Sequence, residues 1–359
     1  MTDLTKNIIE KFDLEHELYF DFTNKVHLLI SDLLEGSGVR VHSVTCRIKE
    51  KNSLLKKLAK PGHSYVHLSD VTDIAGIRIT TFFADEVDRV AKLIEEEFAI
   101  DLVNSTDKRA ALDPDRFGYL SLHHVASLAD ERTNLTEYRR FNNLKVEIQT
   151  RSILQHAWAE IEHDLGYKTA LGIPNEIRRR FSRLAGLLEL ADSEFVAIRD
   201  ALMTYEDTVS EKIERIPQLV EINKASLESF VMNSEVVRRI DEAIARINGG
   251  TVEDAGPKYV EVEIPRLARL GFDSIGELEN SIAKHEALVI AFAERWLSDA
   301  DRGLEFAKGV TLLYFEYVIV AEARDKTLPK ELFESGIGLR AESEQLAEKV
   351  IATYQAISG

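Results

Sequence analysis

The chain has 359 residues, of which 45% are apolar and 30% are charged. At about 150 residues per domain, this length favours two domains, or one domain with a large appendage. The ordinary composition excludes wholesale disorder and collagen-like repeats. A net charge of −17 disfavours broad coating of nucleic acid, although it leaves room for a local basic pocket. The single cysteine, Cys46, excludes an intrachain disulfide and fits a reducing cytoplasm.

The sequence indicates neither a secretion signal nor a membrane span. Residues 1–17 alternate charged and apolar side chains, so they lack the apolar core of a signal peptide. The most apolar stretch, residues 309–321, is interrupted by Glu316 and is shorter than the roughly 20 residues that a bilayer requires. We therefore expect a cytoplasmic protein without a membrane partner, and a buried helix at 309–321.

The first half of the chain predicts a mixed sheet flanked by helices. Residues 4–34 carry apolar side chains at helical spacing and end at Gly36 and Gly38, which is typical of a long helix with a glycine stop. Helical spacing also predicts helices at 52–59 and 86–98. Alternating or β-branched stretches predict strands at 39–48, 74–83, 100–103, 119–127 and 144–150. These elements indicate an α/β or α+β domain that ends near residue 168.

The second half of the chain predicts mainly helices. From Ile177 to Val209, apolar residues recur every three to four positions as a heptad seam, which requires a partner helix. A helical hairpin within the chain is the simplest interpretation, and an oligomer interface or an autoinhibitory cover are alternatives. Further expected elements are helices at 219–247, 274–297, 304–324 and 340–357, and a short strand at 258–264. We therefore divide the chain into an N-terminal helix at 1–38, an α/β domain at 39–170 and an all-α region at 171–359.

Charged residues gather around the first two predicted strands. Residues 40–60 contain seven basic side chains and one acid, and Arg47 and Lys49 face the same side because they lie two apart on a strand. Guanidinium and ammonium groups suit a polyphosphate, although a solvated basic edge has the same pattern. Asp73 precedes the next strand and Arg78 lies within it, where charges are rare. Asp73 could hold Mg²⁺ and Arg78 could contact phosphate or a base, or the two could form a structural pair.

Residues 117–124, with the sequence FGYLSLHH, form a third polar cluster. Tyr119, Ser121 and His123 would project from one face of a strand. An aromatic ring, a hydroxyl and an imidazole suit stacking on a nucleobase and polar recognition of it. An ordinary strand with a solvent-facing polar side would show the same alternation, so this cluster alone leaves both interpretations open.

A fourth cluster spans the last strand of the domain and the helix after it. Glu147, Gln149 and Arg151 share one face of the strand. On the helix, His156 and Glu160 lie four residues apart and therefore share a face. We expect this helix face to support the site through hydrogen bonds rather than to bind zinc, since the sequence lacks an HExxH motif.

Taken in order, these clusters resemble the synthetase domain of the RelA/SpoT-type alarmone synthetases. The motifs that carry the resemblance read TCRIK, DIAGIRI, GYLSLHH and VEIQTRSILQHAWAEIEHDLGYK, and they cover roughly residues 39–168. The resemblance implies a mixed-sheet, nucleotidyltransferase-like fold. It also implies an enzyme that transfers the β,γ-pyrophosphate of ATP to the 3′-hydroxyl of GDP or GTP, makes (p)ppGpp and releases AMP.

The resemblance also implies roles for individual residues. Asp73 and Glu147 would bind Mg²⁺, and Glu147 could instead deprotonate the attacking hydroxyl. The residues expected at the ATP site are Arg47, Lys49, Ser53, Lys56, Lys57 and Arg78. Those expected around the acceptor are Tyr119, His123, Lys108, Arg116, Gln149 and Arg151.

The chain departs from the family pattern at two places, and these departures leave the acceptor open. Cys46 stands where the family usually has glycine, and the acceptor loop reads DRFGYL instead of Lys-Pro-Asn-Gly-Tyr followed by Arg or Gln. An adenosine nucleotide, or the 3′ end of tRNA as in toxins of the same fold, are therefore alternative acceptors. A non-catalytic nucleotide-sensing scaffold is a third hypothesis, but it would have no need of the Asp73 and Glu147 pair. The helical region could bind a second copy of the chain or a protein partner.

Overall fold

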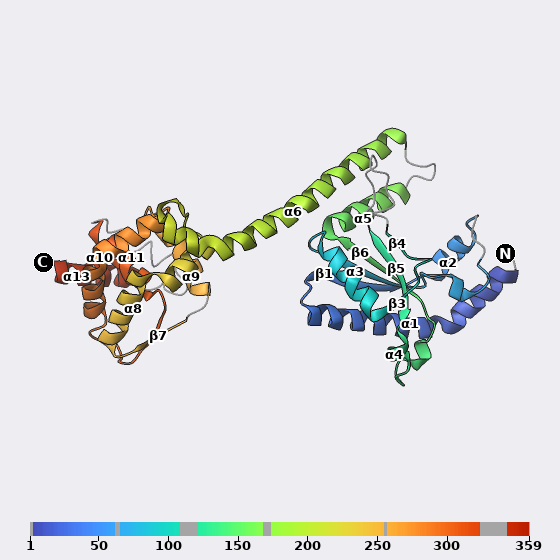
Figure 1. Ribbon diagram of the computed structural model, residues 1–359, viewed down its shortest axis with the longest axis horizontal. Coiled ribbons are helices and arrows are strands. Elements are labelled where there is room, and N and C mark those ends of the chain that lie inside the picture. The colour runs from blue at the N-terminus through green and yellow to red at the C-terminus, as the bar shows by residue number, and fades with distance from the viewer. Residues whose placement is uncertain are drawn as a thin grey trace. The chain divides into compact units, whose positions relative to one another are not determined.

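A computed structural model gives the structure of residues 3–61, 65–107, 121–167, 174–254, 257–323 and 343–358. The chain forms two compact units, residues 1–199 and 200–359, and each unit has its own hydrophobic core (Figure 1). In the part of the chain that the structure describes, no helix is long and apolar enough to cross a membrane.

One mixed sheet forms the centre of the first unit. Its strands are β1 (Val41–Ile48), β2 (Ala75–Thr81), β3 (Phe98–Ile100), β4 (Thr106–Asp107), β5 (Leu122–Leu128) and β6 (Val146–Ser152). They lie in the order β1-β2-β6-β5-β3, and β4 pairs with β5. β2 and β6 run parallel, whereas the other pairs are antiparallel. The predicted fold class, a mixed sheet flanked by helices, is confirmed.

Helices cover both faces of this sheet. The helices of the first unit are α1 (Asp3–Ser37), α2 (Lys51–Leu58), α3 (Glu86–Glu97), α4 (Asp130–Thr133), α5 (Ile153–Tyr167) and the start of α6 (Asn175–Arg215), with short 3₁₀ turns at Leu68–Asp70 and Arg139–Phe141. α1 and α3 pack on the apolar face, where Phe22 of α1 and Ile77 of β2 are buried in one core. Strand side chains alternate, so Gly76 and Arg78 face the opposite side, over which α5 lies (Figure 1).

The strand expected at 100–103 is wrong in its bounds. β3 ends at Ile100, and residues 102–104 form a turn instead. Leu102 and Val103 are 83% and 92% exposed, so they lack the burial that favours an apolar strand. The Asp101 carboxylate also accepts a hydrogen bond from the Asn104 backbone nitrogen at 3.2 Å, which stabilises the turn.

The second unit is predominantly helical, as the composition predicts. After α6 its elements are a 3₁₀ turn at Pro217–Leu219, α7 (Lys224–Asn233), α8 (Glu235–Asn248), β7 (Thr251–Glu253), α9 (Pro257–Arg269), α10 (Ile275–Trp296), β8 (Glu305–Ala307), α11 (Val310–Glu322) and α13 (Ser343–Ser358). β7 and β8 form a small parallel pair. The apolar stretch near 309–321 is the buried helix α11, with Phe315 and Val318 fully enclosed.

Two predictions for the second unit need correction. The strand expected at 258–264 is part of helix α9, because Val260, Glu263 and Leu267 are buried at a helical spacing that the apparent alternation conceals. The helix expected at 304–324 begins only at Val310. Residues 305–307 form β8, and Gly309 adopts a left-handed conformation with a φ of 87° that ends this connection.

The predicted hairpin for the heptad seam is present in part. Trp158 of α5 donates a hydrogen bond from Nε1 to the Phe181 carbonyl at 3.3 Å, and the two rings meet edge to face. Further along the seam in α6, within the residues described, Phe195, Ile198 and Leu202 are 51%, 52% and 59% exposed. α5 therefore covers only the beginning of the seam. The two compact units divide at residue 199, inside α6, whereas the boundary predicted at 170/171 falls in residues 168–173, outside the described part.

A buried carboxylate joins two helices of the second unit. Asp241 of α8 is 1% exposed, and it accepts hydrogen bonds from the backbone nitrogens of Gly309 at 2.7 Å and Thr311 at 2.9 Å. It also accepts one from the Thr311 hydroxyl at 2.6 Å. Asp241 thus caps the N-terminus of α11 from a neighbouring helix and satisfies donors that water cannot reach.

Replacing this carboxylate should destabilise the second unit selectively. We expect Asp241→Ala to lower the free energy of unfolding of that unit by about 2–4 kcal/mol, because buried donors lose their acceptor. Urea denaturation followed by Trp296 fluorescence in a Trp158→Phe background measures this change, since the chain has two tryptophans, one in each unit. Glu242→Ala, the exposed neighbour on the same helix, is the control. Equal effects of the two substitutions would contradict the proposed role of the cap.

Candidate functional site

The strand register gathers the predicted site residues into two adjacent rows on the open face of the sheet. One row contains Arg47 of β1, Gly76 of β2 and Glu147 of β6. The next row contains Arg78 of β2, Gln149 of β6 and His123 of β5. Because alternate strand residues share a face, these side chains project away from the core and toward α5.

A cavity of about 280 Å³ opens on this face. Its lining residues are Thr45, Cys46, Arg47, Gly76, Ile77, Arg78, Glu147, Gln149 and Glu160. A Cβ atom on Gly76 would lie 3.4 Å from Cγ of Arg47, so the glycine lets the arginine side chain pass closely over β2. The Cys46 thiol lies 3.9 Å from the Asn24 side-chain oxygen of α1, at the opposite face of β1.

Two hydrogen bonds orient the Glu147 carboxylate. His123 donates from Nδ1 to Oε1 at 3.0 Å, and Gln149 donates from Nε2 to Oε2 at 3.0 Å. Because a carboxylate only accepts, His123 Nδ1 carries the proton of this bond, and Nε2 lies 2.7 Å from the Ser121 hydroxyl. Burial alone would raise the pKa of Glu147, but His123 outweighs that effect and the pKa falls below its ordinary value. Glu147 is therefore ionised at neutral pH.

Asp73 lies just before β2 and contacts two lysines. Lys49 Nζ is 2.8 Å from Oδ2, and Lys57 Nζ of α2 is 2.8 Å from Oδ1. Burial would raise the pKa of Asp73, but the two ammonium groups lower it below the ordinary value. The negative charge of Asp73 also acts to raise the pKa of Glu147, against the lowering by His123.

Glu160 of α5 acts as the counter-ion of two arginines. Its Oε1 lies 3.0 Å from the Arg78 guanidinium and 3.1 Å from that of Arg151, and His156 Nδ1 is 3.8 Å away. Burial opposes ionisation, yet the arginines bring the pKa of Glu160 below its ordinary value. The helix face after β6 thus supports the sheet by polar contacts, as the spacing of His156 and Glu160 predicts.

The structure does not bring every predicted residue to the cavity. Ser53 and Lys56 lie on exposed positions of α2 and are not among the lining residues. The lining also does not include Lys49, Lys57, Asp73, His123 and Arg151. Tyr119, Lys108 and Arg116 fall within residues 108–120, outside the described part, so their roles stay predictions. Gly76 was missed by sequence reasoning, although a glycine inside a β-branched strand is a known signal of a close approach.

The carboxylates of Asp73 and Glu147 form a donor set that suits Mg²⁺. Mg²⁺ prefers oxygen ligands and is usually held by one or two carboxylates together with water and substrate phosphates. Among the residues described, no group of three or more His, Cys, Asp and Glu side chains could hold a metal. The pair therefore fits a metal whose coordination a phosphate substrate completes, rather than a closed structural site.

The first unit is a mixed α/β domain whose open sheet face carries arginines, with Glu160 as the counter-ion of two of them, and whose Asp73 pairs with two lysines. Residues 46–171 match the family described as the region found in RelA / SpoT proteins. This part of the chain therefore matches the region found in RelA / SpoT proteins, as the motifs indicate, and a helical C-terminal region follows it.

Two curated relatives extend this result to the class of enzyme. GTP pyrophosphokinase YwaC of Bacillus subtilis is 26% identical over 171 residues, which cover 47% of this chain and 78% of that protein. GTP pyrophosphokinase YjbM of the same organism is 28% identical over 172 residues, which cover 48% and 78%. The crystal structure of small alarmone synthetase 1 from Bacillus subtilis aligns with a TM-score of 0.46 at 24% identity, over 54% of this chain and 99% of that one. The curated relatives confirm the prediction of a pyrophosphokinase-type enzyme.

The ion pairs of Asp73 should appear as a pH-dependent contribution to stability. Its folded-state pKa lies below the ordinary value, so the ionised form stabilises the fold above about pH 4, and this contribution is lost as pH falls through the folded pKa. We expect Asp73→Asn to lower the free energy of unfolding by about 1–2 kcal/mol at neutral pH. The difference from wild type should shrink below about pH 4.

Urea denaturation of the metal-free protein between about pH 3 and pH 8 measures this dependence. Glu10→Gln, an exposed position of α1, is the control and should show little difference at any pH. A deficit of Asp73→Asn that stays constant over the whole range would contradict an ionic origin.

Proposed function

We propose that the protein is a Mg²⁺-dependent pyrophosphokinase that transfers the β,γ-pyrophosphate of ATP to the 3′-hydroxyl of GDP or GTP. The observation that carries this proposal is the strand register, which sets Arg47, Gly76 and Glu147 in one row, with the lysine-bound Asp73 just before β2. The relatives named GTP pyrophosphokinase support GDP or GTP as the acceptor. We assign the activity to a synthetase domain at residues 39–170, acting in the cytoplasm.

The cations of the cleft are suited to hold the donor. Lys49 and Lys57 offer ammonium groups to phosphate oxygens, and the Arg47 guanidinium over Gly76 can form forked hydrogen bonds. Asp73 and Glu147 would hold Mg²⁺, which when bound supplies charge neutralisation to the phosphates. The lysines would then pass from the Asp73 carboxylate to the nucleotide, so that no charge in the cleft is left without a counter-ion.

Glu147 is placed to orient the attacking hydroxyl and to accept its proton. In the reaction a bond forms between the 3′-oxygen and the β-phosphorus, and the bond from that phosphorus to the oxygen of AMP breaks. The hydroxyl proton passes to the Glu147 carboxylate. A lowered pKa makes this carboxylate a weak base, so its main contribution is to fix the direction of the hydroxyl. His123 and Gln149 hold both carboxylate oxygens for that task.

The acceptor base would lie on the β5 side of the cleft. His123 lies there, and we propose Tyr119 as the stacking platform with Lys108 and Arg116 as phosphate contacts. The altered loop sequence DRFGYL favours, as a second candidate, an adenosine nucleotide or a tRNA 3′ end as acceptor. For the partly exposed seam of α6 we keep the prediction of a second copy of the chain or a protein partner.

Removal of the Glu147 charge should abolish transfer without unfolding the protein. We expect Glu147→Gln to reduce the rate of AMP release from ATP in the presence of GDP by about 100-fold or more. Glu95→Gln is the matched control, because Glu95 contacts His124 on the other face of β5 and should leave the rate unchanged. Full activity of Glu147→Gln would remove this residue from the mechanism.

The acceptor is identified by following the label of γ-labelled ATP. Four acceptors are tested in separate reactions: GDP, GTP, tRNA, and ATP with no other acceptor. We expect label on GDP and on GTP, with AMP released in an amount equal to the label transferred. Label on tRNA alone would identify the toxin-like activity. A labelled adenosine product with more phosphates than ATP, formed from ATP alone, would identify the adenosine-nucleotide activity. Label on none of them would favour the non-catalytic scaffold.

A further inference from the structure

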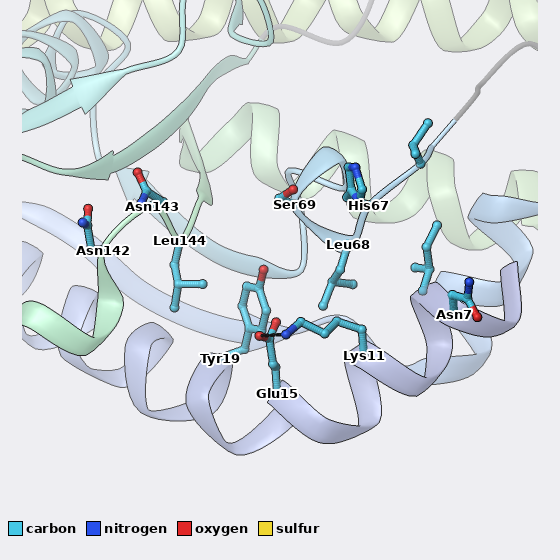
Figure 2. Close-up of a pocket in the computed structure, with 12 residues that line it drawn as sticks. Asn7, Lys11, Glu15, Tyr19, His67, Leu68, Ser69, Asn142, Asn143 and Leu144 are labelled. Atoms are coloured by element: carbon cyan, nitrogen blue, oxygen red, sulfur yellow. Dashed lines mark ion pairs between the residues drawn. The ribbon is translucent and has the colours of Figure 1, made fainter. Parts of the chain in front are cut away.

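A second cavity, of about 500 Å³, lies between α1 and two loops of the first unit (Figure 2). One loop, residues 66–69, leads toward β2, and the other, residues 142–144, leads into β6. The cavity shares no lining residue with the cleft described above. Its volume falls within the range of small-molecule sites.

The Tyr19 hydroxyl is the most informative group in this cavity. Tyr19 is 4% exposed, and within the described ranges its hydroxyl makes no hydrogen bond. Figure 2 shows the ring rising from α1 with the hydroxyl directed into the cavity. Burial and the nearby Glu15 raise the pKa of Tyr19 to about 12, so the group stays a neutral donor and acceptor. A hydroxyl at the wall of a cavity can both donate to and accept from the edge of a bound ligand.

The remaining lining combines an apolar surface with uncharged polar groups. Ile8, Leu68 and Leu144 supply apolar area, and the side-chain amides of Asn142 and Asn143 each offer a donor and an acceptor. Figure 2 shows Leu68, Leu144 and the two asparagines around one space. Such a lining suits a flat ring with an apolar face and a hydrogen-bonding edge.

The charges of the cavity favour a neutral ligand over a polyphosphate. Lys11 and Glu15 form an ion pair at 2.7 Å, so the lining offers no uncompensated lysine or arginine. A phosphate chain needs such cations, and a zwitterion would have to break the existing pair. A neutral ligand leaves the ion pair of Lys11 and Glu15 intact, and the polar edge of such a ligand can still accept or donate hydrogen bonds.

The two loops connect this cavity to the carboxylates of the cleft. Ser69 precedes Asp73 by four residues, and Leu144 precedes Glu147 by three. The first loop is held in shape by Asp70, whose Oδ2 accepts from the backbone nitrogens of Val66 at 2.9 Å and His67 at 2.8 Å. A ligand between the loops would therefore contact both segments that lead to the carboxylates, and could shift their positions.

We propose that this cavity is an effector site for a neutral, planar heterocycle of the nucleoside class, hydrogen-bonded by Tyr19. Its occupancy would change the rate of pyrophosphate transfer, and this second part rests on the function proposed above. The ligand is recognised by its ring face and edge and not by phosphate, which distinguishes it from the substrates of the cleft.

Equilibrium dialysis of labelled guanosine and adenosine against the full chain tests the site. We expect at least one nucleoside to bind, with an affinity reduced about fivefold by Tyr19→Phe, which removes one hydrogen bond. Ser69→Trp, which places a large side chain at the rim, should abolish this binding. Tyr138→Phe, a partly buried tyrosine outside the cavity, is the control and should bind as wild type does. Thermal unfolding of each variant verifies that the fold is retained.

Several outcomes would overturn the site. One is that neither nucleoside binds at millimolar concentration. Another is that binding is unchanged in Tyr19→Phe and in Ser69→Trp but is lost in Gln149→Ala, a variant of the cleft. Tighter competition by GTP than by guanosine for the Tyr19-dependent site would overturn its neutral character. None of these measurements requires catalysis, so they remain valid if the chain transfers no pyrophosphate. Where it does, the saturating nucleoside should change the transfer rate at least twofold in wild type and not in Ser69→Trp, and an unchanged wild-type rate would overturn the effector role.

Discussion

The parallel pairing of β2 with β6 is the constraint on which the site depends. It sets Gly76 beside Glu147 and brings the segment of Asp73 to the same edge of the sheet. The register is fixed by burial, because Ile77 and Ile148 pair on the core face. A slip of one residue would turn Glu147 into the core and an isoleucine into the cleft. The apolar face that packs on α1 thereby determines the chemistry of the opposite face.

The charged groups of the cleft are held by one another in the absence of substrate. Asp73 is the shared counter-ion of Lys49 and Lys57, and Glu160 is the shared counter-ion of the arginines of β2 and β6, so each cluster keeps one net positive charge. Partly buried charges are tolerated only when they are paired, since an unpaired one loses its hydration without compensation. The chain has a net charge of −17, and in this arrangement the cations of the site pair with carboxylates of the site and not with acidic residues on the surface. The phosphate groups of a polyanion can then replace these carboxylates as the partners of the lysines and arginines.

Much of the first unit could be predicted because its elements are long and strongly patterned. The helix at residues 3–37 and the central strands follow from apolar spacing, and the clusters at Asp73 and Glu147 follow from charges placed beside buried strands. Short stretches were less reliable: residues 258–264 alternate as a strand does, yet the burial of Leu267 and its neighbours favours a helix. The close approach at Gly76 depends on the register between strands, which no local pattern determines.

The cavity beside Tyr19 shows most clearly what a sequence conceals. Tyr19 stands at a helical spacing from core residues such as Phe22 and Val26, so its pattern is that of a packing aromatic. Only the folded chain shows that two loops, more than 70 residues apart, leave space above its hydroxyl. Both loops continue into the strands that are locked by the β2–β6 pairing. The register that assembles the cleft therefore also ties it to this cavity, because tightly packed segments transmit displacement rather than absorb it.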